Sequence, residues 1–126
     1  MTANELMIGD WVNYNSLNQR IEEITDVDNQ VYVSGDGVVD IPELNPIPLT
    51  REILEKNGFE GDREVQQFHF EENGEKYHFS LRQMYDKDDI PRGYSFFAFN
   101  VLTILDYVHQ LQHALRLCEI NKEIEL

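Results

Sequence analysis

The residues best suited to chemistry are two histidines in the segment TILDYVHQLQHALRLC, Thr103–Cys118. His109 and His113 stand four residues apart, so a helix would place both on one face. The spacing is similar to the zinc-protease pattern H-E-x-x-H, but Gln110 replaces the glutamate. Because glutamine cannot act as a general base at neutral pH, the sequence argues against a zinc protease. A bare metal site formed by Asp106, His109 and His113 stays open as an alternative.

An apolar stripe predicts that this segment is a helix. Its residues recur at intervals of three and four and are Ile104, Val108, Leu111, Leu115 and Cys118. Thr103 is expected to cap the helix, with Asp106 at the capping-box position. At about 100° per residue, His109 and His113 fall opposite the stripe, so we expect them to face solvent or a partner.

This outer face is the predicted interaction surface of the protein. Uncharged His and Gln side chains beside partly exposed leucines suit a partner helix or sheet, and also a homodimer. The predicted helix surface consists of Leu105, His109, Gln110, His113 and Leu117.

Other constellations give weaker indications of chemistry. His69 and His78 are predicted to face each other across a hairpin, where two nitrogens alone make a poor metal site. Cys118, the single cysteine, is expected to pack as a small hydrophobe, which leaves no intramolecular disulfide. Asp88 and Asp89 are read as a solvated turn. The chain contains neither a G-x-S-x-G elbow nor a glycine-rich phosphate loop, and we expect no cofactor.

The composition indicates an acidic globular protein. The chain has 126 residues, of which 41% are hydrophobic, and a formal charge of −14 from 24 acids and 10 bases. Residues 1–48 hold nine acids and one base, Arg20. Such a surface repels phosphate, so we expect neither nucleic-acid nor membrane binding. With no leader and no apolar run of membrane length, the sequence predicts a cytoplasmic protein.

Short β-prone runs separated by turn signals fill residues 5–48. Leu6–Val12 is an apolar segment that a Gly-Asp turn is expected to break, and the following strands are expected at Arg20–Thr25, Gln30–Ser34 and Val38–Ile41. Strands this short and this evenly spaced predict a small SH3-like β-barrel. The prolines of IPELNPIPLT then predict an extended connection. Thr50 is expected to cap a short helix, 51–57, that Gly58 ends.

A hairpin and a third strand are predicted to follow. Asn73-Gly74 is a preferred two-residue hairpin turn, and it would pair Phe70 with Tyr77 and Phe68 with Phe79 on an aromatic face. Residues 94–100 read as a third strand. The expected fold is therefore α+β, with a barrel in residues 1–48 and a strand layer covered by the C-terminal helix in residues 49–126. The pattern leaves open whether residues 119–126 form helix or strand.

Three phrases give the chain a family resemblance. They are NELMIGDWV at Asn4–Val12, PIPLTREILEKNGFE at Pro46–Glu60 and YVHQLQHAL at Tyr107–Leu115. In this order they resemble a family of small proteins of unknown function from gut Bacteroidetes and their phages. That family has a glycine-containing break after the helix, where this chain has Leu117-Cys118-Glu119. The resemblance implies no catalytic residues.

The sequence therefore favours a non-enzymatic protein-interaction module linked to a mobile element or phage, with an unidentified protein partner. Two alternatives stay open. One is a metal-binding protein or metal-dependent enzyme that uses the helix histidines. The other is an acidic DNA mimic, which would require carboxylates spaced like phosphates.

Overall fold

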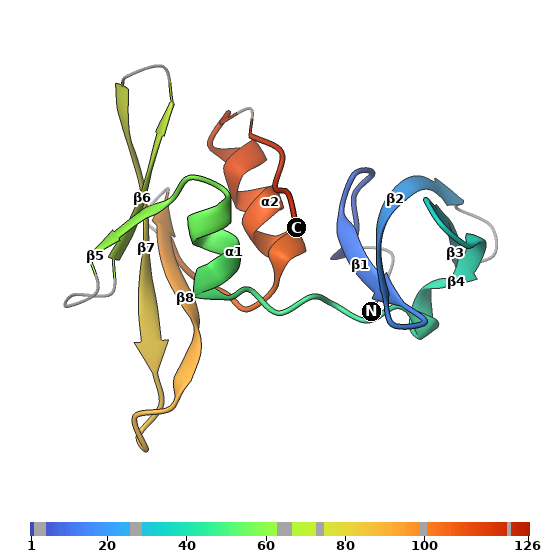
Figure 1. Cartoon of the computed structure of the whole chain (residues 1–126), viewed down its shortest axis with the longest axis horizontal. Helices are drawn as coiled ribbons and strands as arrows, with labels where there is room; N and C mark the ends of the chain where they lie inside the picture. Colours follow the sequence, from blue (N-terminus) through green and yellow to red (C-terminus); the bar gives the residue numbers. More distant parts are fainter. Residues whose placement is uncertain (2–4, 26–28, 63–66, 73–74, 99–100, 121) are drawn as a thin grey trace. The chain divides into compact units, whose positions relative to one another are not determined.

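The protein is α+β, with two antiparallel sheets and a C-terminal helix (Figure 1). The computed structural model describes residues 1, 5–25, 29–62, 67–72, 75–98, 101–120 and 122–126. Two compact units are present. The first combines Met1–Pro48 with Tyr107–Lys122, and the second combines Leu49–Asp106 with Glu123–Leu126. Within the described residues no helix is long and apolar enough to cross a membrane.

The first unit contains a four-stranded meander of order β1-β2-β3-β4. Its strands are β1 (Trp11–Tyr14), β2 (Leu17–Thr25), β3 (Gln30–Val33) and β4 (Gly37–Asp40). Asn15 and Ser16 form the β1–β2 turn with φ of 52° and 64°, the positive values that a tight hairpin requires. The segment Leu6–Val12 is broken by a turn at Gly9, as predicted, and β1 begins only after it, at Trp11. No closed barrel is found among the described residues.

One face of this meander carries the core of the first unit. The alternating strand residues point inward, and the segments before β1 and after β4 complete the cluster. The buried core side chains are Leu6, Val12, Ile21, Val31, Val33, Val39, Ile41 and Leu44. Beyond the 3₁₀ turn η2 (Ile41–Glu43), Asn45 returns to β1 and exchanges two backbone hydrogen bonds of 2.8 Å with Asn13. The outer edge of β1 is thereby paired.

Helix α2 (Val108–Leu117) starts later than predicted and belongs to the first unit. Its N-cap is Tyr107, whose N–H donates to the side-chain oxygen of Gln110 at 3.0 Å. Val108, Leu111 and Leu115 are buried, as the stripe predicts. The sequence assigns the helix to residues 49–126, whereas its first residues are held to the N-terminal segment, with Val108 N–H donating to the Ile47 carbonyl at 2.9 Å.

The predicted cap at Thr103 is wrong because Thr103 lies in a strand. Strand β9 (Val101–Leu105) pairs with β8 (Pro91–Ala98), so that Phe96 faces Thr103 and Tyr94 faces Leu105. The backbone groups of Thr103–Leu105 are thus used by the sheet, and Asp106 precedes the helix. A short apolar run is compatible with both periodicities, and here the long-range pairing decides.

Without glycine, α2 nevertheless ends in a Schellman motif. The N–H of Glu119 donates to the Arg116 carbonyl at 3.0 Å, and that of Ile120 donates to the Leu115 carbonyl at 2.9 Å. Glu119 takes the left-handed position, with φ of 60°, that glycine usually occupies. Residues 119, 120 and 122–126 form neither helix nor strand.

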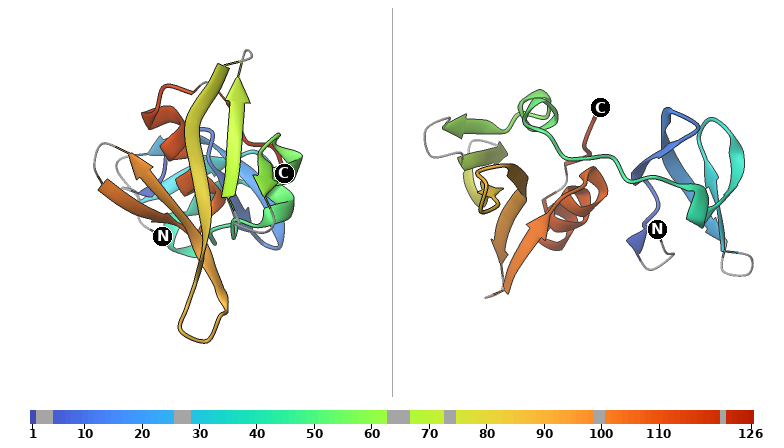
Figure 2. Two further views of the ribbon diagram at one scale, coloured as in Figure 1. Left: turned by 90° about the vertical axis from the view of Figure 1, so that its left-hand side faces the viewer. Right: turned by 90° about the horizontal axis from the view of Figure 1, so that it is seen from below.

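The second unit contains α1 and a five-stranded meander of order β5-β6-β7-β8-β9. The elements before β8 are α1 (Arg51–Lys56), β5 (Glu60–Asp62), β6 (Gln67–Glu72) and β7 (Glu75–Tyr85). The hairpin formed by β7 and β8 extends beyond the other strands of this sheet (Figure 2). Strands β5 and β9 were not predicted; β5 is a three-residue edge strand with no alternating pattern.

The short helix α1 begins at Arg51, as predicted, and ends at Lys56, one residue before the predicted end, with Asn57 as its C-cap. The Thr50 hydroxyl accepts the Ile53 N–H at 3.3 Å, and Gly58 has φ of 84°. Phe59 is buried, and its N–H donates to the Leu54 carbonyl at 3.0 Å. Because the local cap and stop residues are both present, the sequence alone determines where this helix begins and ends.

A β-bulge corrects the predicted register between β6 and β7. Glu71 pairs with Lys76, but a register shift beyond it places Phe68 opposite Leu81 and His69 opposite Ser80. His69 is therefore not opposite His78. Asn73-Gly74 and the side chains of the predicted aromatic face lie outside the described residues. Glu72 pairs with Glu75, as predicted.

Candidate functional site

A buried carboxylate, Asp10, is the most unusual feature of the first unit, since it is 0% exposed. It follows Gly9, whose φ of 92° turns the chain sharply. The turn is held by the Asp10 N–H, which donates to the Met7 carbonyl at 3.1 Å. In return the Met7 N–H donates to Asp10 Oδ2 at 2.8 Å. The loop thus directs a carboxylate inward, where it needs a cationic partner.

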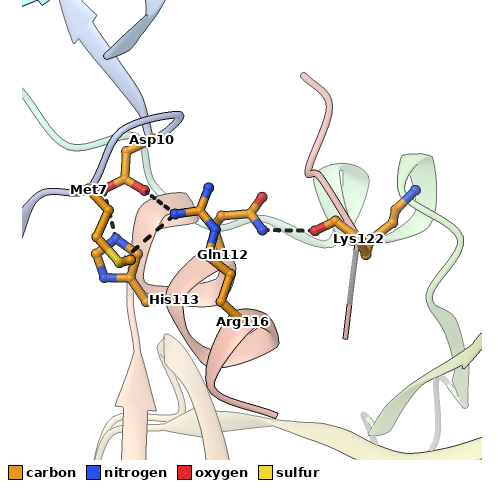
Figure 3. A network of polar contacts seen from close by, with 6 residues as sticks. All are labelled: Met7, Asp10, Gln112, His113, Arg116 and Lys122. Carbon is orange, nitrogen blue, oxygen red and sulfur yellow. Dashed lines mark hydrogen bonds and ion pairs between the residues drawn. The ribbon is translucent and has the colours of Figure 1, made fainter. Parts of the chain in front are cut away.

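Helix α2 supplies the partners (Figure 3). His113 Nε2 lies 2.7 Å from Asp10 Oδ2, and Arg116 Nη1 lies 3.8 Å from Oδ1. The His113 and Arg116 side chains are three residues apart and share one helix face. Arg116 also approaches the loop closely, because a Cβ added at Gly9 would come within 3.0 Å of its Nη2. We call Asp10, His113 and Arg116 the Asp10 cluster.

His109 lies one turn earlier on α2 and is 2% exposed. Its ring stacks on Tyr107 at 5.9 Å and meets the edge of His113 at 5.7 Å. Burial lowers the pKa of His109, His113 lowers it further, and the Asp10 carboxylate opposes the shift. Its Nδ1 is buried without a hydrogen-bond partner in the part of the chain described. The neutral ring packs as an aromatic side chain.

The structure does not assemble the metal site that the sequence left open. Asp106 is exposed and precedes the helix, and His113 is paired with Asp10. Across the described residues, no three His, Cys, Asp or Glu side chains are grouped so that they could hold a metal ion. His69 and His78 have no described side-chain positions.

The predicted helix surface is also corrected. Leu105 is buried in β9, His109 is buried, and Gln110 is half-buried at the helix N-terminus. Leu117 alone of the predicted set is exposed, at 63%. The expectation fails because the side of α2 opposite the apolar stripe packs on the Asp10 loop.

The Asp10 cluster is suited to a structural role, in which it holds α2 to the loop that precedes β1. An Asp–His pair orients a base in hydrolases, but such a base needs a hydroxyl or thiol to activate. In the described structure, the hydrogen bonding of His113 is to Asp10. Burial raises the pKa of the half-buried Cys118 thiol, which disfavours the nucleophilic thiolate.

A second candidate surface is the outer face of the first sheet, which the sequence reasoning missed. The register places Glu23 opposite Tyr32 and Tyr32 opposite Val38 in one row. Tyr32 is 40% exposed and Val38 is 47% exposed. Alternation along β3 was the available signal, because Val31 and Val33 flank Tyr32 and point to the core.

One end of this outer face carries a cation–π pair. Trp11 lies opposite Arg20 on the neighbouring strand, and the Arg20 guanidinium sits 4.6 Å from the indole centroid. The other end carries Asp40, which pairs with Gln30 and accepts its side-chain N–H at 2.8 Å. The charge on the face therefore changes from basic near β1 to acidic near β4.

No protein-family model, no curated protein and no solved structure matches this chain.

Proposed function

We propose that this protein is a non-enzymatic interaction module whose first unit binds a basic segment of a partner protein. We extend the proposal to a role in a mobile element or phage, which rests on the resemblance of the three sequence phrases. The property that identifies the partner is the positive charge of this segment.

The charge of residues 1–48, which form the larger part of the first unit, carries the proposal. Residues 1–48 contain nine acids and one base. That base, Arg20, is placed over the Trp11 ring. The described acids of the segment, apart from buried Asp10, are exposed: Glu5, Glu22, Glu23, Asp36, Asp40 and Glu43. Such a surface accelerates encounter with a cationic partner and repels nucleic acid.

The use of the chemically capable residues supports a binding role. The side chains of Asp10 and His113 pair with each other and so hold α2 to the loop that precedes β1. The Cys118 thiol has a raised pKa. The sheet that follows this loop is already ordered in the folded protein. A surface on it is suited to binding, because the conformational entropy is lost on folding and not on binding.

We further propose that the first sheet is an incomplete SH3-like barrel. The support is the return of the chain to β1 after η2, where Asn45 bridges Asn13. A longer pairing at this bridge would close the sheet on itself.

Selection from a random-peptide display library on the full chain tests the function. We expect the retained peptides to be rich in Lys and Arg and to be released as salt is raised. The matched variant carries Glu22→Lys, Glu23→Lys and Asp40→Lys, which reverse exposed charges, and it should retain none of the peptides. Equal retention by the variant, or enrichment of acidic peptides, would refute the proposal.

A further inference from the structure

The outer face of the first sheet, at its β4 end, combines apolar and acidic side chains in register. The row of Glu23, Tyr32 and Val38 crosses three adjacent strands. Cross-strand neighbours in a sheet are about 5 Å apart, so the phenol ring lies between a carboxylate and an aliphatic side chain. Asp40 stands two residues beyond Val38 on β4, about 7 Å further along the same face.

Both apolar members of this row are accessible. Tyr32 and Val38 are two of the large exposed hydrophobic side chains of the first unit, and they are direct neighbours across β3 and β4. Single exposed apolar residues are common on protein surfaces, whereas exposed apolar residues that adjoin one another form the start of a contiguous patch, the feature that marks interaction sites.

The edge beside this row is open to another strand. Strand β4 ends the order of the first sheet, and in the described part of the chain no strand pairs with its other side. At the opposite edge, Asn45 pairs with β1 through two backbone hydrogen bonds. Because the edge of β1 already pairs with Asn45, an extended segment would add to the edge of β4.

The charge of the side chains around Tyr32 and Val38 determines which kind of extended segment can bind there. Glu22, Glu23 and Asp40 are exposed around the apolar pair, and Arg20 is held in the next row against Trp11. A Lys or Arg side chain placed over the Tyr32 ring would lie beside the Glu23 carboxylate and gain a cation–π contact. An acidic segment would be repelled at the same position.

We infer that the Tyr32–Val38 face, with the free edge of β4, binds an extended basic segment of a partner protein in which a cationic and an apolar residue stand two positions apart and so share one face of the added strand. The cation contacts Tyr32 and Glu23, and the apolar residue contacts Val38. This inference rests on the proposed function and assigns its site.

Calorimetric titration of the full chain tests the site, with a peptide that repeats Lys-Ser-Val-Ser, the Lys–Val peptide, as the probe, because Lys and Val then share one face of the extended chain. A peptide that repeats Glu-Ser-Val-Ser, the Glu–Val peptide, serves as the charge control. Tyr32→Ser and Glu23→Gln should each weaken binding about fivefold. Tyr32→Phe should keep the wild-type affinity because the aromatic ring is kept. The matched controls, Leu17→Ser and Glu43→Gln, change an exposed apolar and an exposed acidic residue outside the row and should change affinity less than twofold.

The outcomes separate the site from the function. If Glu43→Gln weakens binding as much as Glu23→Gln, and Tyr32→Ser has no effect, the proposed site is wrong although a basic partner still binds. If the Lys–Val peptide does not bind the wild-type chain, or binds no better than the Glu–Val peptide, both the site and the proposed function fail. Circular dichroism of each variant establishes that the sheet is intact.

Discussion

Replacing the buried carboxylate in Asp10→Ala should strongly destabilise the first unit. The side chain accepts the Met7 N–H at 2.8 Å and pairs with His113 at 2.7 Å. The cost of removing one partner reaches about 3–5 kcal/mol when both partners are charged and fully buried. Because the His113 and Arg116 side chains are 27% and 26% exposed, water can solvate them after the change. We therefore expect a loss of about 3 kcal/mol, at the lower end of the range.

The single tryptophan, Trp11, makes this loss measurable, since it lies in β1 beside the altered loop. Urea unfolding followed by its fluorescence gives the free energy of unfolding of the first unit. Asp10→Asn keeps an acceptor for the Met7 N–H and should cost less than Asp10→Ala. Asp40→Ala, an exposed control, should cost at most about 0.5 kcal/mol. If Asp10→Ala unfolds with the same midpoint as Asp40→Ala, the Asp10 cluster does not hold α2.

Three further predictions concern stability. Burial lowers the pKa of His109 below its usual 6.5, so the folded state disfavours the protonated ring, and the free energy of unfolding should fall as pH drops below 6.5. His109→Phe should reduce this dependence, as measured by Trp11 fluorescence in urea. Glu119→Gly should raise the free energy of unfolding by about 1 kcal/mol in thermal unfolding, because it relieves a left-handed residue. Asn57→Ala should lower it by about 2 kcal/mol in urea unfolding, because the buried amide bonds both the N–H and the carbonyl of Glu125.

Each of these predictions has a contradicting result. An unchanged pH slope in His109→Phe would show that other groups govern the acid sensitivity. A loss of stability in Glu119→Gly would mean that the Schellman motif at the end of α2 is not formed. For Asn57→Ala, the control is Asn18→Ala, which removes an exposed side-chain amide. Equal stability of the two variants would exclude a structural role for the contact with Glu125.

The sequence predicted best those elements whose ends are determined by residues close to them in the sequence. Thr50 and Gly58 mark the two ends of α1, and the β-prone run Gln30–Ser34 predicted β3, which ends at Val33. The start of α2 could not be obtained in the same way. Thr103 is a good cap residue, but its backbone pairs with β8 in the sheet. A register shift by one bulge likewise changed the partners of Phe68 and His69 without any sign in the sequence.

The candidate site depended on contacts between residues far apart in the chain. Helical spacing correctly placed His109 and His113 together and away from the apolar stripe. It could not show that Asp10, 103 residues from His113, would cover that side of the helix. The sequence signal for this pairing was an acid directly after a glycine inside an apolar segment, and a turn explains such a pattern equally well.

The most direct test of the central claim is a titration of the full chain with the Lys–Val peptide, followed by backbone amide signals in NMR. Binding at the Tyr32–Val38 face predicts saturable shifts in Gln30–Val33 and Gly37–Asp40, with smaller shifts in β2 near Glu23. Signals of α2 and of the second unit should not move. Shifts spread evenly over exposed acids, or centred on α2, would contradict the claim that this face is the binding surface.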